Sequence, residues 1–393
     1  MLTVEDLDVR GKTVFIRVDF NVPMDENGAI RDDTRIRASL PTIQYLLKQG
    51  ARIVLASHLG RPKGKVNPKY SLKPVAQRLS ELISREVIFA ADSIGDETSR
   101  LKRELKEGQV LLLENVRFHA EEEANDIGYS QKLAEGIDIF INDAFGSSHR
   151  AHSSVVGIAQ FVPKSAAGYL LKKEVDYLSK ALHAPAKPYS AILGGAKVSD
   201  KIPVLENLLN KADDILIGGA MAYTFFKAQG YEVGRSLVEK DKMGMALDVL
   251  QKARERKVNF CLPEDHVLAA SAASGPAARI VDSFPFPPEF MAVDIGPKTI
   301  AKYSEIIAQA RTIFWNGPLG VFEVEEFAHG TMKIALAVAN AKAVSIVGGG
   351  DSIAAVYKAG VSGQMTHIST GGGASLEFLA NETLPGLEAL KGQ

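Results

Sequence analysis

A run of three glycines within HISTGGGASLEFLA (residues 367–380) carries the first chemical signal in the sequence. A β-branched segment precedes the glycines and a helix-forming segment follows them, so they mark a corner between a strand and a helix. Unpaired backbone N–H groups and the helix dipole favour anions at such a corner. Gly371, Gly372 and Gly373 remove the Cβ atoms that would keep a phosphate away, although one or two glycines also serve a tight turn. Since the first turn of the expected helix carries no acid, we expect a phosphoryl group there.

Further strand-like runs in the second half of the chain also end in glycine. They are LGGAK (193–197), IGGAM (217–221), WNGPLG (315–320) and VGGGDS (347–352). Lys197 and Lys201 stand four residues apart across an expected helix start, which places both ammonium groups on one side, within reach of a polyphosphate. The alternative for these lysines is a solvated helix face. Neither GxxxxGK[ST] nor GxGxxG occurs, which excludes the P-loop and the common dinucleotide fingerprint.

Asp351 lies between the two glycine-richest corners, where its carboxylate would repel a phosphate. A plain N-cap is the ordinary structural role for such a residue. A magnesium ion resolves the repulsion, because Mg²⁺ is usually held by one or two carboxylates together with phosphate oxygens. The sequence therefore predicts a metal-bound nucleotide at GGGDS and a phosphoryl group in transfer at STGGG.

Basic and polar side chains follow the apolar runs of the first half. They are Asp19 and Asn21, then His58 and Arg61, then Arg117 and His119, and finally His149, Arg150 and His152, while Arg35 opens the first expected helix. Ligands of open α/β sheets sit at the carboxyl ends of the strands. A single such arginine is most often a solvated surface group. Because the guanidinium fork matches carboxylate and phosphate oxygens, the whole set predicts a pocket for a small, multiply anionic molecule.

Short β-branched runs alternate with longer amphipathic runs in both halves of the chain. Near-continuous apolar strands separated by helices indicate parallel sheets covered on both faces. We therefore predict an α/β fold with two doubly wound units. The segment KSAAGYLLKKEVDYLSKAL (164–182) predicts one long helix between them, and the proline-containing HAPAKP that follows places the boundary near residues 183–188. This joint is either a hinge or a mere connector.

Composition excludes several classes of protein. The 393 residues carry 46 Lys and Arg against 47 Asp and Glu, and a net charge of −1 draws the chain to neither nucleic acid nor an acidic membrane. A single cysteine, Cys261, cannot form an internal disulfide and suits a reducing compartment. The N-terminus lacks a signal pattern and no run is long enough to span a bilayer, so we expect a cytoplasmic protein. We also expect a monomer, because no apolar surface stripe is evident.

The sequence resembles the phosphoglycerate kinase family over essentially its whole length. The motifs that carry this resemblance are RVDFNVP, DDTRIRASLPTI, SHLGRPKG, LLLENVRF, NDAFGSSHRAH, LGGAKVSDKI, WNGPLGVFE, GGGDS and HISTGGGASLEFL, in the family's order. The resemblance implies two Rossmann-like domains. Residues 1–172 would bind 3-phosphoglycerate or 1,3-bisphosphoglycerate, 173–188 would form the linking helix and hinge, and 189–372 would bind MgADP or MgATP. The tail 373–393 would pack back on the first domain, and in-line transfer would follow hinge closure.

Residue roles follow from the matching motifs. For the phosphoglycerate, the resemblance implies Asp19, Phe20, Asn21, Arg35, His58, Leu59, Gly60, Arg61, Arg117, Arg150 and His152. For the nucleotide it implies Lys197, Lys201, Gly219, Asn316, Glu323, Gly349, Gly350, Asp351 and Ser352, with Asp351 holding Mg²⁺. Catalytic roles fall on Arg35, Lys197, Lys201, Gly372 and Gly373. Small departures, in IGGAMAYTF and at Ser352 where Thr is common, remove no functional group that the activity needs.

The expected chemistry requires no general base. The carboxylate of 3-phosphoglycerate has a pKa of about 3.5 to 4 and is ionised at pH 7. Phosphoryl transfer then depends on in-line positioning and on neutralisation of charge.

Two other classes of function remain open. An acetate-kinase-like enzyme would not need this many arginines for a monoanion, and a metabolite sensor would not need Asp351 or an acid-free helix start.

Overall fold

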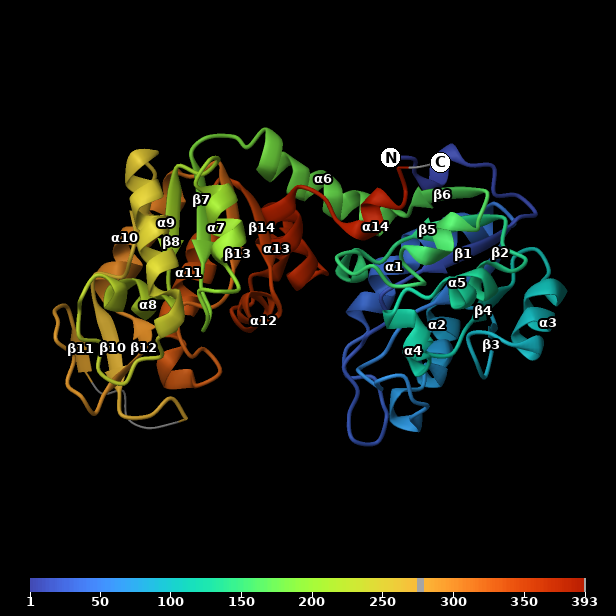
Figure 1. The fold of residues 1–393 in the computed structure, drawn as a ribbon, viewed down its shortest axis with the longest axis horizontal. Helices are drawn as coiled ribbons and strands as arrows, with labels where there is room; N and C mark the ends of the chain where they lie inside the picture. Colours follow the sequence, from blue (N-terminus) through green and yellow to red (C-terminus); the bar gives the residue numbers. More distant parts are fainter. Residues whose placement is uncertain (274–278, 392–393) are drawn as a thin grey trace. The chain divides into compact units, whose positions relative to one another are not determined.

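The computed structural model describes residues 1–273 and 279–391, and the chain folds into two compact units (Figure 1). Unit 1 comprises Met1–Asp176 and Thr383–Gln393, and unit 2 comprises Tyr177–Glu382. The tail segment 373–393 therefore divides between the units after Glu382. Its last residues, 392–393, and residues 274–278 of the expected nucleotide domain lie outside the described part of the chain.

Unit 1 is built on a six-stranded parallel sheet in the order β3-β4-β2-β1-β5-β6. Its strands are β1 (Thr13–Arg17), β2 (Arg52–Ala56), β3 (Val87–Phe89), β4 (Val110–Leu112), β5 (Ile139–Asn142) and β6 (Lys164–Ala167). Its helices are α1 (Thr34–Lys48), α2 (Lys73–Ile83), α3 (Asp96–Glu104), α4 (Ala120–Glu123), α5 (Ile127–Ala134) and α14 (Pro385–Glu388), and α6 (Tyr169–His183) starts in it. Every residue of β1 is buried, as expected for a parallel strand covered on both faces.

Unit 2 contains a second six-stranded parallel sheet, in the order β15-β14-β13-β7-β8-β9. Its strands are β7 (Tyr189–Leu193), β8 (Asp214–Ile217), β9 (Asn259–Cys261), β13 (Thr312–Asn316), β14 (Val344–Gly348) and β15 (His367–Ile368). The helices are α7 (Ile202–Leu208), α8 (Met221–Ala228), α9 (Met243–Glu255), α10 (Pro297–Gln309), α11 (His329–Asn340), α12 (Gly350–Lys358) and α13 (Gly372–Asn381). The prediction of an α/β fold with two parallel-sheet units is confirmed.

A small antiparallel sheet in unit 2 was not predicted. It consists of β10 (His266–Ala269), β11 (Arg279–Val281) and β12 (Met291–Ile295), in the order β11-β10-β12. These strands span only a few residues each and lack the alternation with helices that identified the parallel strands. Runs of three to five residues are too short to show an alternation that would distinguish a strand from a loop.

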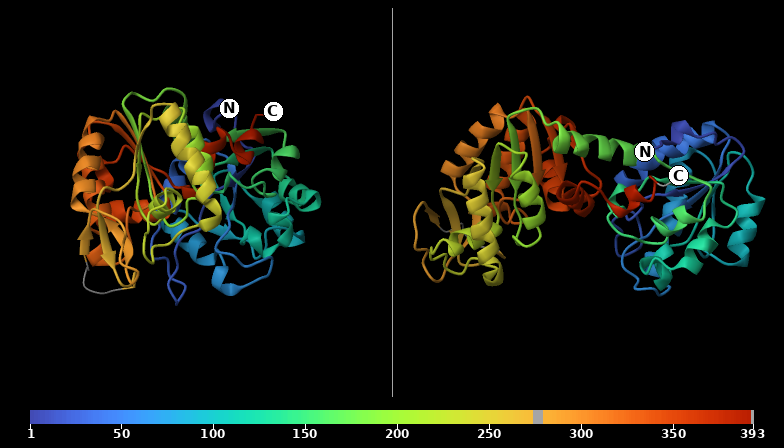
Figure 2. Two further views of the ribbon diagram at one scale, coloured as in Figure 1. Left: turned by 60° about the vertical axis from the view of Figure 1, so that its left-hand side comes forward. Right: turned by 45° about the horizontal axis from the view of Figure 1, so that its top comes forward.

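The prediction of one helix over residues 164–182 is wrong at its N-terminal end. Lys164–Ala167 forms β6, which pairs in parallel with β5, and the helix α6 begins only at Tyr169. The small residues of KSAA fit a pleated strand beside β5 as well as they fit a helix, and Gly168 then separates strand from helix. From Tyr169 to His183, α6 is continuous, and it crosses from unit 1 into unit 2 after Asp176 (Figures 1 and 2).

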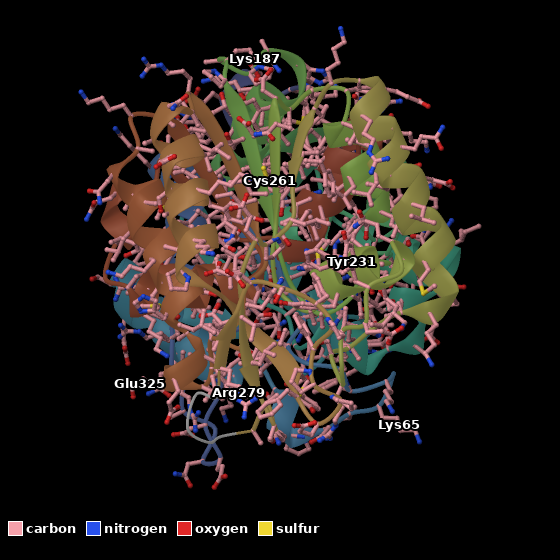
Figure 3. The ribbon with its side chains drawn as sticks, turned by 90° about the vertical axis from the view of Figure 1, so that its left-hand side faces the viewer. Lys65, Lys187, Tyr231, Cys261, Arg279 and Glu325 are labelled. Carbon is pink, nitrogen blue, oxygen red and sulfur yellow. The ribbon has the colours of Figure 1, made fainter. Side chains whose placement is uncertain are left out.

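The single cysteine lies inside unit 2, at the end of β9 (Figure 3). Its side chain is buried, and burial raises the pKa of the thiol. Cys261 is therefore a packing residue of unit 2. Among the described residues, no helix combines the length and the apolar character that crossing a membrane requires.

Candidate active site

The carboxyl ends of strands in unit 1 carry most of the predicted anion-binding side chains. Asp19 and Asn21 follow β1, His58 follows β2, Arg117 follows β4, and Arg150 and His152 follow β5, while Arg35 lies in the first turn of α1. All these strands run parallel, so their carboxyl ends lie on one edge of the sheet. The topology thus brings together residues as far apart in the chain as Asp19 and His152.

Hydrogen bonds connect several of these residues directly. Arg35 Nη1 donates to Asp19 Oδ2 at 2.8 Å. Asn21 Oδ1 accepts a hydrogen bond from Gly60 N at 2.8 Å, and Arg117 Nη1 donates to Gly60 O at 3.0 Å. The loop after β2 is therefore held between the loops that follow β1 and β4.

Two buried charged residues of this region were missed from the sequence. Arg17, the last residue of β1, is fully buried; its Nε donates to Ser154 Oγ at 2.8 Å and its Nη2 lies 3.0 Å from His58 Nδ1. Glu122 is also fully buried and accepts hydrogen bonds from Ser154 N and Ser154 Oγ. An arginine inside the otherwise apolar run VFIRV (14–18) was an available signal for Arg17. Glu122 lies within a run of glutamates and gave no such signal.

The arginines that cluster here make this site electrostatically positive. Their charge and the burial of their neighbours shift the pKa values of three side chains. Burial, assisted by Arg17 and Arg117, lowers the pKa of His58 well below its usual value. Burial and Arg117 likewise lower the pKa of His152 to about 3, so both imidazoles are neutral at pH 7. Burial and the neighbouring Arg17 also lower the pKa of Arg117, to about 10. A bound anion would relieve this repulsion between the buried guanidinium groups.

Other predicted residues of unit 1 lie at the margin of this set. Arg61 is exposed. Phe20 and Leu59 are buried, Phe20 N donates to Ser57 Oγ, and Leu59 O accepts a hydrogen bond from Asn115 Nδ2, so both residues serve the packing of these loops. Gly60 has φ +61°, and a Cβ there would lie 2.4 Å from the Tyr70 ring, which explains the glycine without a ligand.

His119 pairs away from the arginine set. Its Nε2 lies 2.6 Å from Asp92 Oδ1, and this hydrogen bond raises the pKa of His119. The histidine therefore joins the loop after β4 to the loop that precedes α3.

A cavity of about 450 Å³ in unit 2 gathers the predicted phosphate-binding residues. It is lined by Gly194, Gly195, Ala196, Lys197, Asp200, Lys201, Asn316, Gly317, Pro318, Gly349, Gly350, Asp351, Ser352, Gly372, Gly373 and Leu376. These residues come from the carboxyl ends of β7, β13 and β14 and from the starts of α12 and α13. Four of the five glycine corners that the sequence singled out thus meet at one place, and Gly219 of the fifth lines a neighbouring cavity.

The two lysines line this cavity from a loop, whereas the sequence predicted that they share one side of a helix start. Helix α7 begins at Ile202, after both of them, so they do not share a helix face. Lys197 is exposed on the loop that follows β7, whereas Lys201 is buried and donates to Asn316 Oδ1. Burial lowers the pKa of Lys201 to about 8, against the opposing effect of Asp200 and Asp351. An additional anion beside Lys201 would stabilise its charged form.

Asn316 and Ser352 differ in the hydrogen bonds that their side chains make. Ser352 Oγ accepts a hydrogen bond from Gly317 N, so Ser352 fixes the backbone of the loop after β13. Asn316 is buried, and its Nδ2 has no hydrogen-bond partner within the described residues. The free amide donor of Asn316 lines the cavity and suits a phosphate oxygen.

A second cavity, of about 290 Å³, adjoins the first and shares Gly195, Ala196, Pro318 and Asp351 with it. Its other lining residues are mostly apolar and include Tyr223, Leu237, Val293 and Leu319, together with the predicted Gly219 and Glu323. Gly219 has φ +69°, and a Cβ there would lie 2.6 Å from Gly195 N, so only glycine fits between the loops. Together, the two cavities provide a polar and an apolar compartment side by side.

Comparisons with known proteins agree on one family. A family model described as phosphoglycerate kinase matches residues 4–382. The phosphoglycerate kinase of Acidobacterium capsulatum is 59% identical to this chain, over 99% of this chain and 98% of its own length. That of Koribacter versatilis is 58% identical, with 99% and 98% covered. The solved phosphoglycerate kinase of Coxiella burnetii is 43% identical and superimposes with a TM-score of 0.89, covering 99% of this chain and 98% of that one.

Proposed function

The chain belongs to the phosphoglycerate kinase family, and from this membership we propose how its two units divide the reaction. The enzyme transfers a phosphoryl group reversibly between 1,3-bisphosphoglycerate and ADP, which gives 3-phosphoglycerate and ATP. Unit 1 binds the phosphoglycerate and unit 2 binds the nucleotide. The observation that carries this assignment is the cavity of about 450 Å³, which lysines, an asparagine and four glycine corners line together.

The arginine set of unit 1 supports a role in binding the phosphoglycerate. Arg35 and Arg117 offer guanidinium forks that match its phosphate and carboxylate oxygens. His58 and His152 are neutral at pH 7, because burial among arginines lowers the pKa of each. The positive charge of the site therefore comes from arginine and persists across the physiological pH range.

The paired cavities of unit 2 suit the two parts of a nucleotide. The glycine corners and Lys201 line the polar cavity, which fits the phosphates. Tyr223 and Leu319 line the apolar cavity, which fits the base, and the exposed Glu323 there suits the ribose hydroxyls. Asp351 lines both cavities and thus marks the point where ribose and phosphates join.

Asp351 fits a magnesium ion that accompanies the nucleotide. Its exposed carboxylate lies in the first turn of α12 at the cavity wall, and a carboxylate with phosphate oxygens is the ligand set that Mg²⁺ prefers. When bound, Mg²⁺ would neutralise part of the phosphate charge. We infer that Asp351 holds this metal in MgADP and MgATP.

Phosphoryl transfer then proceeds in line, after closure of the two units around both substrates. Arg35 of unit 1 and Lys197 and Lys201 of unit 2 stabilise the charge that spreads over the transferred group. The first turn of α13, Gly372–Ser375, is uncharged and offers the N–H groups of Gly372 and Gly373 to the same group. The acceptor carboxylate is already ionised, so no side chain needs to act as a base.

A coupled assay tests this function directly. We expect turnover with 3-phosphoglycerate and MgATP and none with acetate and MgATP. Turnover with acetate would indicate the acetate-kinase class, and absence of turnover with both acceptors would indicate a sensor. The cytoplasmic location and the monomeric state stay predictions.

A further inference from the structure

The chain passes between the two units at two places, once within α6 after Asp176 and once after Glu382. On the unit 1 side, the segments that lead to these crossings are α6 and the C-terminal segment with α14 (Figures 1 and 2). Both segments are hydrogen-bonded to the same point, the carboxyl end of β5, at Asn142 and Asp143.

Asp143 holds the start of α6. It is fully buried, and its Oδ1 accepts hydrogen bonds from Leu170 N at 2.9 Å and Leu171 N at 3.2 Å, in the first turn of the helix. A Cβ at Gly168 would lie 2.1 Å from this oxygen, so the glycine makes room for the carboxylate. The first N–H groups of a helix have no partner within it, and a carboxylate there also meets the positive end of the helix dipole.

Asn142 holds the C-terminal segment. Its side chain is fully buried, and Nδ2 donates to Gly386 O at 3.3 Å and to Ser148 Oγ at 3.1 Å. Gly386 N in turn donates to Ser148 O at 2.8 Å. A Cβ at Gly386 would lie 2.9 Å from Ser148 Cβ, which shows how closely the two segments pack.

The same two residues also belong to the framework of the phosphoglycerate site. Asp143 N donates to the carbonyl of Arg17 at 2.9 Å, on the strand that leads to Asp19. Ser148, which binds both Asn142 and the C-terminal segment, is two residues before Arg150. Hydrogen bonds thus connect the strands and loops of the phosphoglycerate site to α6 and to the C-terminal segment by way of Asn142 and Asp143.

We propose that Asn142 and Asp143 are positioning residues that couple occupation of the phosphoglycerate site to the two chain crossings, and so to closure. This proposal rests on the proposed function. The competing explanation is that both residues only stabilise unit 1, since a buried carboxylate that caps a helix does so in any fold.

Asp265 provides a matched control for Asp143. It is also buried, and it accepts hydrogen bonds from Lys298 N at 2.9 Å and Thr299 N at 2.8 Å at the start of α10. Gly296 makes room for it as Gly168 does for Asp143. Helix α10, however, lies wholly within unit 2 and crosses no boundary.

The test compares Asp143→Ala with Asp265→Ala, which remove the acceptor oxygens at the two helix starts, below the melting temperature of both. We expect Asp143→Ala to lower kcat ~10-fold, and Asp265→Ala to leave it within twofold, because displacement of positioning elements acts on the reacting geometry. Binding of 3-phosphoglycerate or MgADP alone should change less than twofold in either variant. The contraction that both ligands together produce, measured by small-angle X-ray scattering on this non-reacting pair, should be reduced in Asp143→Ala only.

Gly386→Ala provides a second variant, should Asp143→Ala fail to fold. Its added Cβ displaces the C-terminal segment from Ser148 and should give the same combination of lower kcat and reduced contraction. Full contraction and equal kcat in all the variants would overturn the proposal. If the wild-type protein shows neither contraction nor turnover with these ligands, the proposed function itself is wrong.

Discussion

Lys201 shows at the scale of one residue how the fold prepares a site for an anion. Its ammonium group is buried, and its described hydrogen bond is to the neutral amide of Asn316. Desolvation therefore outweighs Asp200 and Asp351 and lowers the pKa to about 8. The lysine is only partly charged in mildly alkaline solution, and a bound polyphosphate would restore its charge.

The affinity for MgADP should therefore depend on pH. As pH rises through about 8, free Lys201 loses its proton, and binding must then take the proton up again. We expect the dissociation constant to increase between pH 7 and 9.5, by about tenfold per pH unit at the upper end, where one proton is taken up. Lys201→Arg should flatten the profile, because arginine stays charged. Calorimetry in buffers of different ionisation enthalpy measures the proton uptake; equal slopes for both proteins would contradict this role.

Arg35 should affect turnover without affecting the nucleotide. Arg35→Ala removes the guanidinium group that is paired with Asp19, and the loss of one such group typically costs about 10² to 10³ in kcat. The affinity for MgADP, measured by calorimetry, should stay within twofold, since Arg35 belongs to unit 1.

Arg37→Ala is the control, because Arg37 lies on the same helix, is exposed and pairs with Asp33. It should leave kcat nearly unchanged. A collapse of ADP affinity in Arg35→Ala would show that the substrates are assigned to the wrong units.

At the scale of elements, the starts of α12 and α13 pack against each other. A Cβ at Gly372 would lie 2.9 Å from Gly349 Cα and 3.2 Å from Gly349 N. The glycines at these corners thus serve close backbone packing as well as access for a ligand. A bulky residue at position 372 would disturb the corner at Gly349 too, so its effects on turnover and on nucleotide binding would not be separable.

Gly350→Ala and Gly372→Ala distinguish access for a ligand from close backbone packing. The space around a Cβ at Gly350 is open, so Gly350→Ala should change the free energy of unfolding by less than about 0.5 kcal/mol. It should nevertheless weaken MgADP severalfold, because the methyl group enters the polar cavity. Gly372→Ala overpacks the Gly349 corner and should destabilise unit 2 by about 1 to 3 kcal/mol. Denaturant unfolding and calorimetry measure both effects, and equal destabilisation by the two variants would contradict this reading.

The sequence predicted these corners well because each glycine follows an apolar, β-branched run that is hard to mistake for a helix. It predicted β6 and the start of α7 poorly. Lys164–Ala167 becomes a strand only through its pairing with β5, and Lys201 is buried only through the tertiary fold. Arg17 and Glu122 were missed for the same reason, because their burial and their shared contact with Ser154 join distant parts of the chain.

At the scale of the whole molecule, each unit has its own core and contains a buried aspartate whose pKa is raised to about 7. One core surrounds the sheet of unit 1 and another surrounds that of unit 2. Burial raises the pKa of Asp143 in unit 1 to about 7, and burial raises that of Asp294 in unit 2 to about 7 as well. Asp294 accepts hydrogen bonds from Gly330 N and Ile295 N, within unit 2.

Stability should therefore fall as pH rises from about 4 to 7, through a separate residue in each unit. Each carboxyl group binds its proton more tightly in the folded than in the unfolded protein, where its pKa is 3.8, so its contribution is complete below pH 3.8 and is lost as pH rises through about 7. Asparagine has no proton to lose. The free energy of unfolding of Asp143→Asn relative to the wild type should increase by up to about 2 kcal/mol between pH 5 and 7. Asp294→Asn should behave likewise.

In scanning calorimetry, Asp143→Asn should shift the transition of unit 1 and Asp294→Asn should shift that of unit 2, because the cores are separate. A shift of one common transition by both variants would mean that the two units unfold as a single cooperative body.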